Sequence, residues 1–308
     1  FLIMDYTSYI IGQLQVEDII DAIKGVNNTN VIKDYVLPVV LPIISSVLSY
    51  FIATRLFYRQ EYLKAQRRKV SVVNKCIYDY FSAMTTLLQI KGNYYGGVSI
   101  SENPIERALA FPVVVFSGAP LSSDLSELAC ILSQKGVGNN REPAKTTNWG
   151  DAFAVSDIAR RFNSLLAALN VRNDFDDTYR GMIIESTGSP LPTMRFKNDD
   201  IVNAIGSNKA AYYIDITEQI MIMIDVLLLD INLLLKELPL YAESLFDKRV
   251  MQEDSGILKF NDLHERFPLL MKPVTPPSIK LMSDYLGYSE DEILRRYPYP
   301  FFNMHDCE

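Results

Sequence analysis

The chain has 308 residues, of which 48% are hydrophobic and 22% charged, and this composition excludes the disordered and collagen-like classes. Its net charge is −7, and residues 70–308 carry 31 acidic against 22 basic side chains, so this acidic main body would repel phosphate backbones. We therefore expect no nucleic-acid partner. The three cysteines lack a CxxC spacing, which indicates free thiols rather than a disulfide framework.

Residues 1–33 are predicted to form an extracytoplasmic amphipathic segment. Its apolar side chains fall near one helical face between residues 9 and 26, at Ile11, Leu14, Ile19, Ile23 and Val26. Such a helix can lie on the outer leaflet or pack on a neighbour. A short capping helix is the alternative interpretation.

The next segment, residues 34–57, is predicted to be a transmembrane anchor. Twenty consecutive residues between Asp34 and Arg55 carry no charge, which is about the length that a helix needs to cross the hydrocarbon core of a bilayer. Pro38 and Pro42 lie near the start of this run, where first-turn amides lack partners in any helix. The alternative is the buried core helix of a soluble protein.

A basic cluster follows the apolar run directly. It consists of Arg55, Arg59, Lys64, Arg67, Arg68 and Lys69, against the single acid Glu61. Under the positive-inside rule this cluster places the larger, C-terminal part of the chain in the cytoplasm. The expected localisation is the cell membrane, with a single pass and with the lipid bilayer as one partner.

Three small residues, Ser45, Ser49 and Ala53, recur every four positions in the apolar run. Small residues at this spacing let two helix backbones approach closely in lipid, which predicts a homo-oligomer. Chance placement of small residues is the alternative. A 3-4 pattern of apolar residues continues from Leu63 to Leu87, and Gly92 is a suitable stop signal, so we predict one helix that continues the anchor and contributes to self-association.

The remaining chain to residue 272 is predicted to be a cytoplasmic helical bundle. We expect helices near residues 104–116, 123–134, 150–170 and 208–238, with an irregular stretch at 171–200. The 208–238 helix is apolar on two faces and is expected at the centre of the bundle. A second membrane span there is disfavoured, because Asp225, Asp230 and Asn232 lie inside it.

Residues 273–308 are predicted to form a tail rich in proline and aromatic residues. Ser289 and Glu292 have the spacing of a capping box for a short helix that ends at Arg296. The strip that follows contains four aromatic side chains, Tyr297, Tyr299, Phe301 and Phe302. This strip can pack on the protein's own bundle or bind a protein partner.

Catalytic, metal and cofactor sites are not predicted. His264 and His305 lack a zinc-binding context, and His305 with Cys307 forms a weak metal candidate at the chain end. Asp174, Asp176 and Asp177 resemble the start of a calcium loop that closes at Glu185. Tyr179, however, stands at the position where such a loop needs glycine.

The predicted fold class is therefore all-α, with a single transmembrane helix continuous with a cytoplasmic bundle. The favoured function is a membrane-anchored interaction protein, such as a scaffold, sensor or adaptor, that self-associates. One alternative is a membrane-acting defence or cell-suicide effector. Another is an enzyme with an unfamiliar helical site built from the four acids above, or from Arg160 and Arg161 as anion binders.

Overall fold

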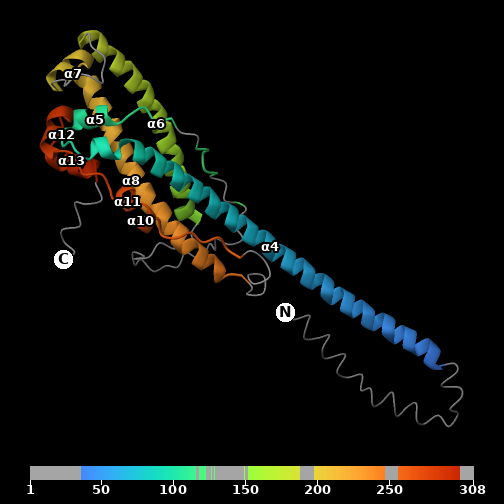
Figure 1. Ribbon diagram of the computed structural model, residues 1–308. Helices are drawn as coiled ribbons and strands as arrows, with labels where there is room; N and C mark the ends of the chain where they lie inside the picture. The colour runs from blue at the N-terminus through green and yellow to red at the C-terminus, as the bar shows by residue number, and fades with distance from the viewer. Residues whose placement is uncertain are drawn as a thin grey trace, which may run out of the picture. The chain divides into compact units, whose positions relative to one another are not determined.

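The computed structural model describes residues 36–115, 118–122, 126, 128, 149, 152–187, 198–246 and 256–298. The chain divides into two compact units, Phe1–Ala65 and Gln66–Glu308. Within the described ranges, regular structure is helical and no strand occurs, which confirms the all-α prediction (Figure 1). The predicted amphipathic helix at 9–26 and nearly all of the predicted helix at 123–134 fall outside the described residues.

Helix α4, Leu37–Val98, begins in the first unit with the uncharged run. Pro38 occupies its first turn, while Pro42 lies inside the helix and cannot donate a backbone hydrogen bond. The Ser46 hydroxyl donates to the Pro42 carbonyl at 2.7 Å. The run consists mainly of apolar residues and contains no glycine, which would weaken a helix.

In the second unit, α4 buries the apolar row that the sequence pattern predicts. The buried members include Val70, Val73, Ile77, Tyr80, Met84 and Leu87. The prediction that Gly92 stops the helix is wrong, because α4 continues to Val98. Tyr94 and Val98 are fully buried beyond this glycine, and their packing outweighs a helix cost of about 1 kcal/mol for glycine.

Helices α5, Pro104–Ala110, and α6, Ala152–Thr187, follow. The Asn103 side chain caps α5 by accepting a hydrogen bond from the Ile105 amide at 3.1 Å. Helix α6 is longer than predicted. The expectation of irregular structure at 171–200 is wrong up to Thr187 and again from Asn198, where a further helix begins. The buried side chains of this extension are Arg172, Asp176, Tyr179 and Ile183. Because two of them are charged, the sequence shows no apolar helical period there.

Helix α8, Ser207–Glu243, is buried along much of its length and confirms the prediction of a helix at 208–238. It packs against α5, α6, the short helix α7 (Asn198–Ile205) and two C-terminal helices (Figure 1). Its apolar core includes Ile214, Met221, Ile224 and Leu228. A helix with apolar side chains around most of its circumference needs several partners, and α8 has them.

The C-terminal elements of the second unit are short. They are α10 (Leu263–Arg266), α11 (Pro268–Met271), α12 (Ile279–Leu286) and α13 (Glu290–Arg296). The predicted cap of α13 is confirmed, since the Ser289 hydroxyl accepts from the Glu292 amide at 3.3 Å. Helix α12 ends at Gly287, whose φ of 72° suits a residue without a side chain. Met282 and Ile293 anchor α12 and α13 to a core shared with α5, α6, α7 and α8.

Candidate functional site

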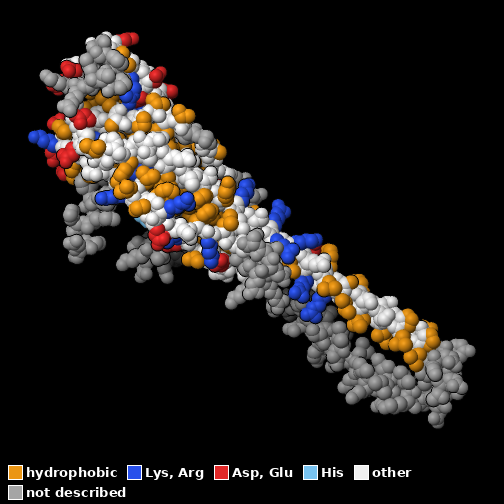
Figure 2. All heavy atoms as spheres, in the orientation of Figure 1, with side chains coloured by type: hydrophobic (Ala, Val, Ile, Leu, Met, Phe, Trp, Pro, Cys, Tyr) orange, Lys and Arg blue, Asp and Glu red, His pale blue; other side chains and the backbone are white. Residues whose placement is uncertain are grey.

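The most unusual surface of the protein is the apolar segment, which we define as residues 37–53 of α4. Each of these residues is exposed, including Leu41, Ile43 and Leu48 at 55–58% of their full accessible area. Figure 2 shows hydrophobic side chains open to solvent along this part of α4. Among the described residues, α4 is the one helix long and apolar enough to cross a membrane, and none of its apolar window is buried.

The three small residues of the apolar segment lie where the sequence pattern places them, on one helical face. Ser45, Ser49 and Ala53 are four residues apart in a continuous helix, and each is exposed. The Ser45 hydroxyl donates to the Pro42 carbonyl at 3.4 Å, so it is partly satisfied within its own helix. This face carries short side chains, and no described residue covers it.

The basic cluster continues α4 past the apolar segment. Arg55, Arg59 and Lys64 belong to the first unit and are exposed. The exposed Arg67 and Arg68 and the half-buried Lys69 belong to the second unit. Lys64 forms a surface ion pair of 2.9 Å with Glu61. An exposed pair of this kind contributes at most about 1 kcal/mol.

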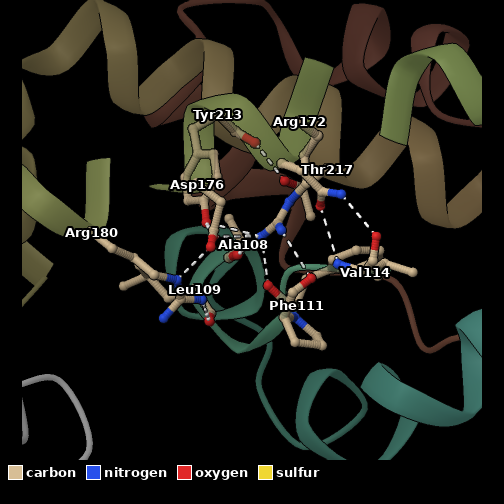
Figure 3. A network of polar contacts seen from close by, with 11 residues as sticks. Ala108, Leu109, Phe111, Val114, Arg172, Asp176, Arg180, Tyr213 and Thr217 are labelled. Atoms are coloured by element: carbon tan, nitrogen blue, oxygen red, sulfur yellow. Dashed lines mark hydrogen bonds and ion pairs between the residues drawn. The ribbon is translucent and has the colours of Figure 1, made fainter. Parts of the chain in front are cut away.

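The interior of the second unit contains a polar network that the sequence did not predict (Figure 3). At its centre the fully buried Arg172 guanidinium donates to the carbonyls of Ala108, Phe111 and Pro112 at 2.6–3.0 Å. The three carbonyls lie at the end of α5, where a helix leaves its last carbonyls without partners. Arg172 therefore caps α5 from α6 and stacks over the Phe111 ring at 4.6 Å.

Asp176 balances the charge of this network. It lies 3.0 Å from Arg172 and 2.5 Å from Arg180, and it also accepts from the Tyr213 hydroxyl of α8. Burial is the main reason why the pKa of the Tyr213 hydroxyl is raised, so it stays a proton donor. Arg180 reaches further, to the Leu109 carbonyl at 2.7 Å. Together these contacts join α5, α6 and α8.

A second set of buried charges joins α4, α5 and α8. Arg107 binds Glu218 through two hydrogen bonds, of 2.7 and 3.0 Å, and both side chains are fully buried. Lys91 lies 2.6 Å from Asp225 with side-chain exposures of 0% and 2%. Burial lowers the pKa of Lys91 and raises that of Asp225, and the attraction between them opposes both shifts.

These charges also hold the stretch before α12 in place. Lys91 donates to the Lys272 carbonyl and Arg107 to the Thr275 carbonyl, each at 2.7 Å. The Asp225 carboxylate accepts from the Val274 amide at the same distance. The buried ion pairs therefore satisfy backbone groups that the irregular stretch would otherwise leave unpaired. These contacts attach the stretch to α4, α5 and α8.

The acids and arginines considered for catalysis do not converge. Asp176 points into the network described above, whereas Asp174, Asp177 and Glu185 are exposed on α6. Both arginine candidates are occupied by acids, with Arg160 bound to Asp157 and Arg161 bound to Asp157 and Asp230. Among the residues that the structure describes, no three metal-ligating side chains come together.

One cavity of about 490 Å³ opens on the second unit, between α4 and the stretch leading into α10. The stacked rings of Phe81 and Phe260, 4.0 Å apart, form one wall. On another side, Lys236 and the His264 amide bind Asp262, and mainly because of Lys236 the pKa of this carboxyl falls to about 2. His264 itself is exposed on α10.

The aromatic tail is described only at its beginning. The Tyr297 ring is fully buried in the core of the second unit, and its hydroxyl donates to Asp215 of α8. Packing of the strip on the protein's own helices is therefore seen at this residue. Tyr299, Phe301, Phe302, His305 and Cys307 lie outside the described residues.

Comparisons of the chain with protein-family models, with curated proteins and with solved structures found no match. Within the described residues, the buried charges of the second unit are engaged in structural contacts, whereas the apolar segment is exposed and Arg55, Arg59 and Arg68 have no acidic partner.

Proposed function

We propose that this protein is a membrane-anchored helical interaction protein, in which the apolar segment crosses the bilayer and the second unit is a cytoplasmic helical bundle. The observation that carries the proposal is that every residue from 37 to 53 is exposed. A soluble core helix would bury one face, which this segment does not. Removing each Val, Leu, Ile or Phe side chain from water stabilises a protein by about 1.5–3 kcal/mol.

The dimensions of the segment support a single crossing. Twenty uncharged residues in a helix span about 30 Å, which is the thickness of the hydrocarbon core. In lipid every backbone group needs an internal partner, and the α-helix provides one. Tyr50, Phe57 and Tyr58 are exposed aromatic side chains toward the basic end, where an interfacial belt is expected. The basic cluster supports a cytoplasmic second unit.

Self-association is the interaction that we propose for the anchor. The apolar row from Val70 to Leu87 packs inside the second unit, so it does not present a free seam to a second copy. The small face at Ser45, Ser49 and Ala53 is free, and it is the part of the helix suited to close packing in lipid. An interaction protein also needs a further protein partner, which the second unit would recruit.

Membrane anchoring can be tested with two lysines in the apolar segment. The Ile43→Lys, Val47→Lys double variant should leave carbonate-washed membranes, because each lysine near a helix centre opposes insertion by about 2.5–3.5 kcal/mol. A matched control changes two exposed leucines of the second unit, Leu240→Lys and Leu269→Lys. The wild type and this control should stay in the membrane pellet. A wild-type chain in the supernatant would contradict anchoring.

Self-association can be tested by crosslinking in intact membranes. Ser49→Leu should reduce the yield of crosslinked oligomer several-fold, because its larger side chain separates the two backbones on the small face. Val47→Leu enlarges a side chain on the opposite side of the same helix and should leave the yield unchanged. An unchanged yield in Ser49→Leu would remove the small face from the proposal and leave the anchor intact.

A further inference from the structure

The basic cluster is the strongest concentration of one charge in the chain. Between Arg55 and Lys69 six basic residues face one acid, Glu61, whereas the chain as a whole carries a net charge of −7. Elsewhere in the described chain, exposed arginines such as Arg160 and Arg296 have acidic partners at 2.5–2.8 Å. The cluster therefore departs from the charge balance of the rest of the surface.

Three arginines of the cluster are available to a partner. Arg55, Arg59 and Arg68 are exposed, and within the described part of the chain none of them has an acidic side chain in contact. The exposed aromatic rings of Tyr58 and Tyr62 stand beside them on α4, with 68% and 51% of their area accessible. Uncompensated cations next to aromatic rings suit the boundary between lipid tails and headgroups.

The charges do not form a stripe on one face. Arg55 and Arg59 are four residues apart and share a face, whereas Lys64 is nine residues from Arg55, about half a circumference away at roughly 100° per residue. In the second unit, Arg67, Arg68 and Lys69 are consecutive, so each is turned by about 100° from the one before. A protein surface or a nucleic-acid groove would meet one side of such a helix. A layer of lipid headgroups meets every side.

We propose that the basic cluster binds anionic phospholipid headgroups in the leaflet that adjoins it, and that the protein carries a shell of these lipids around α4. This inference rests on the proposed membrane anchoring and adds the class of lipid. Anionic phospholipids are the expected ligands because their charge complements the cluster and because the cluster continues the apolar segment on one helix. A guanidinium group can bind two phosphate oxygens through parallel hydrogen bonds, so exposed arginines are suited to phospholipid headgroups.

The test measures which lipids accompany the full-length chain. The wild type is extracted from membranes in polymer-bounded discs without detergent, and the lipids in the discs are compared by mass spectrometry with those of the whole membrane. The anionic fraction should be enriched by about twofold or more. In the Arg55→Gln, Arg59→Gln, Arg68→Gln variant the enrichment should fall to that of the bulk membrane.

The matched control removes three positive charges from exposed sites of the second unit, as Lys209→Gln, Lys280→Gln and Arg295→Gln. It should retain the wild-type enrichment, which separates a local effect from a change in net charge. A wild-type protein that stays in the membrane without anionic enrichment would overturn this inference and leave anchoring standing. The same holds if the triple variant of the cluster keeps its enrichment. A chain that never enters the discs would overturn anchoring itself.

Discussion

The apolar segment and the second unit place polar and apolar groups in opposite ways. Residues 37–53 expose apolar side chains all around a helix, whereas the second unit buries Lys91, Arg107 and Arg172 with their acidic partners among its helices. An exposed apolar surface is unfavourable in water, whereas charged side chains are unfavourable in lipid. The apolar helix is stable where water is absent, and the buried charges are stable where every one of them has partners.

The difference also shows in what each region uses its charges for. In the second unit, arginines satisfy carbonyl groups at the end of α5 and in the stretch before α12, so their charge stabilises the fold. In the basic cluster, Arg55, Arg59 and Arg68 have no such carbonyl or carboxylate within the described chain. The same residue type is structural in one region and available in the other.

The largest loss of stability is expected from removing a buried acid. Glu218→Ala leaves the Arg107 guanidinium buried without its bidentate partner, and the free energy of unfolding should fall by about 3–5 kcal/mol. Thermal unfolding of the full chain in mild detergent, followed by circular dichroism, measures this loss. Gln219→Ala, one residue along and exposed, is the control and should change little. An equally stable Glu218→Ala would show that the ion pair is not needed.

Two isoleucines of α4 compare the regions directly. Ile77 is fully buried in the second unit, so Ile77→Ala should lower its unfolding free energy by about 2–5 kcal/mol. Ile44 is 52% exposed, and Ile44→Ala should leave the same transition unchanged. Thermal melts of both variants in one detergent provide the comparison. Similar losses in the two variants would contradict the assignment of Ile44 to an uncovered surface.

A smaller effect is expected from one hydroxyl of the Arg172 network. Tyr213→Phe removes a donor to Asp176 and an acceptor for Arg172, and should destabilise the second unit by about 1–3 kcal/mol. Tyr212→Phe removes the hydroxyl from the neighbouring, exposed tyrosine and should stay within about 0.5 kcal/mol of the wild type. Urea unfolding measures both. Equal effects would mean that the buried hydroxyl has no special partner.

The smallest effect concerns the pH dependence at Asp262. Its folded pKa of about 2 lies below the ordinary 3.8, so its contribution to stability is present above pH 4 and is lost as the pH falls toward 2. Lys236→Met should raise this pKa, as measured by carboxyl carbon NMR titration. Lys259→Met removes a neighbouring cation that pairs with Glu243 and should not raise it. Equal shifts in both variants would contradict a specific bond from Lys236.

The helical fold was largely predictable where apolar residues mark a period. The rows in α4 and α8 and the Ser289 cap of α13 all have local signals. The second half of α6 was not predictable, because Arg172 and Asp176 occupy inward positions and resemble surface residues. Their partners come from α5 and from Tyr213 of α8, which lies 41 residues beyond Arg172 in the chain. Only the folded arrangement identifies them as core residues.

The candidate site, unlike the second half of α6, was predictable from local sequence. Its apolar and basic residues are contiguous in the sequence, and the uncharged run identifies them without any tertiary contact. The structure adds that residues 37–53 are uncovered and that the row from Val70 to Leu87 is occupied within the second unit. The sequence alone did not show that this row is occupied inside the second unit, because a 3-4 apolar row suits self-association as well as packing within one chain.

The most direct test of the account is to map contact with lipid tails along the chain. The full-length protein in its membrane is labelled with a photoactivatable probe dissolved in the hydrocarbon core and then digested with trypsin. Cleavage at Lys33 and Arg55 releases residues 34–55 as one peptide, which contains the whole apolar segment. We predict that this peptide carries the label and that peptides from α6 and α8 do not. A membrane-bound chain whose 34–55 peptide is unlabelled, or is labelled no more than those of α8, would contradict the account.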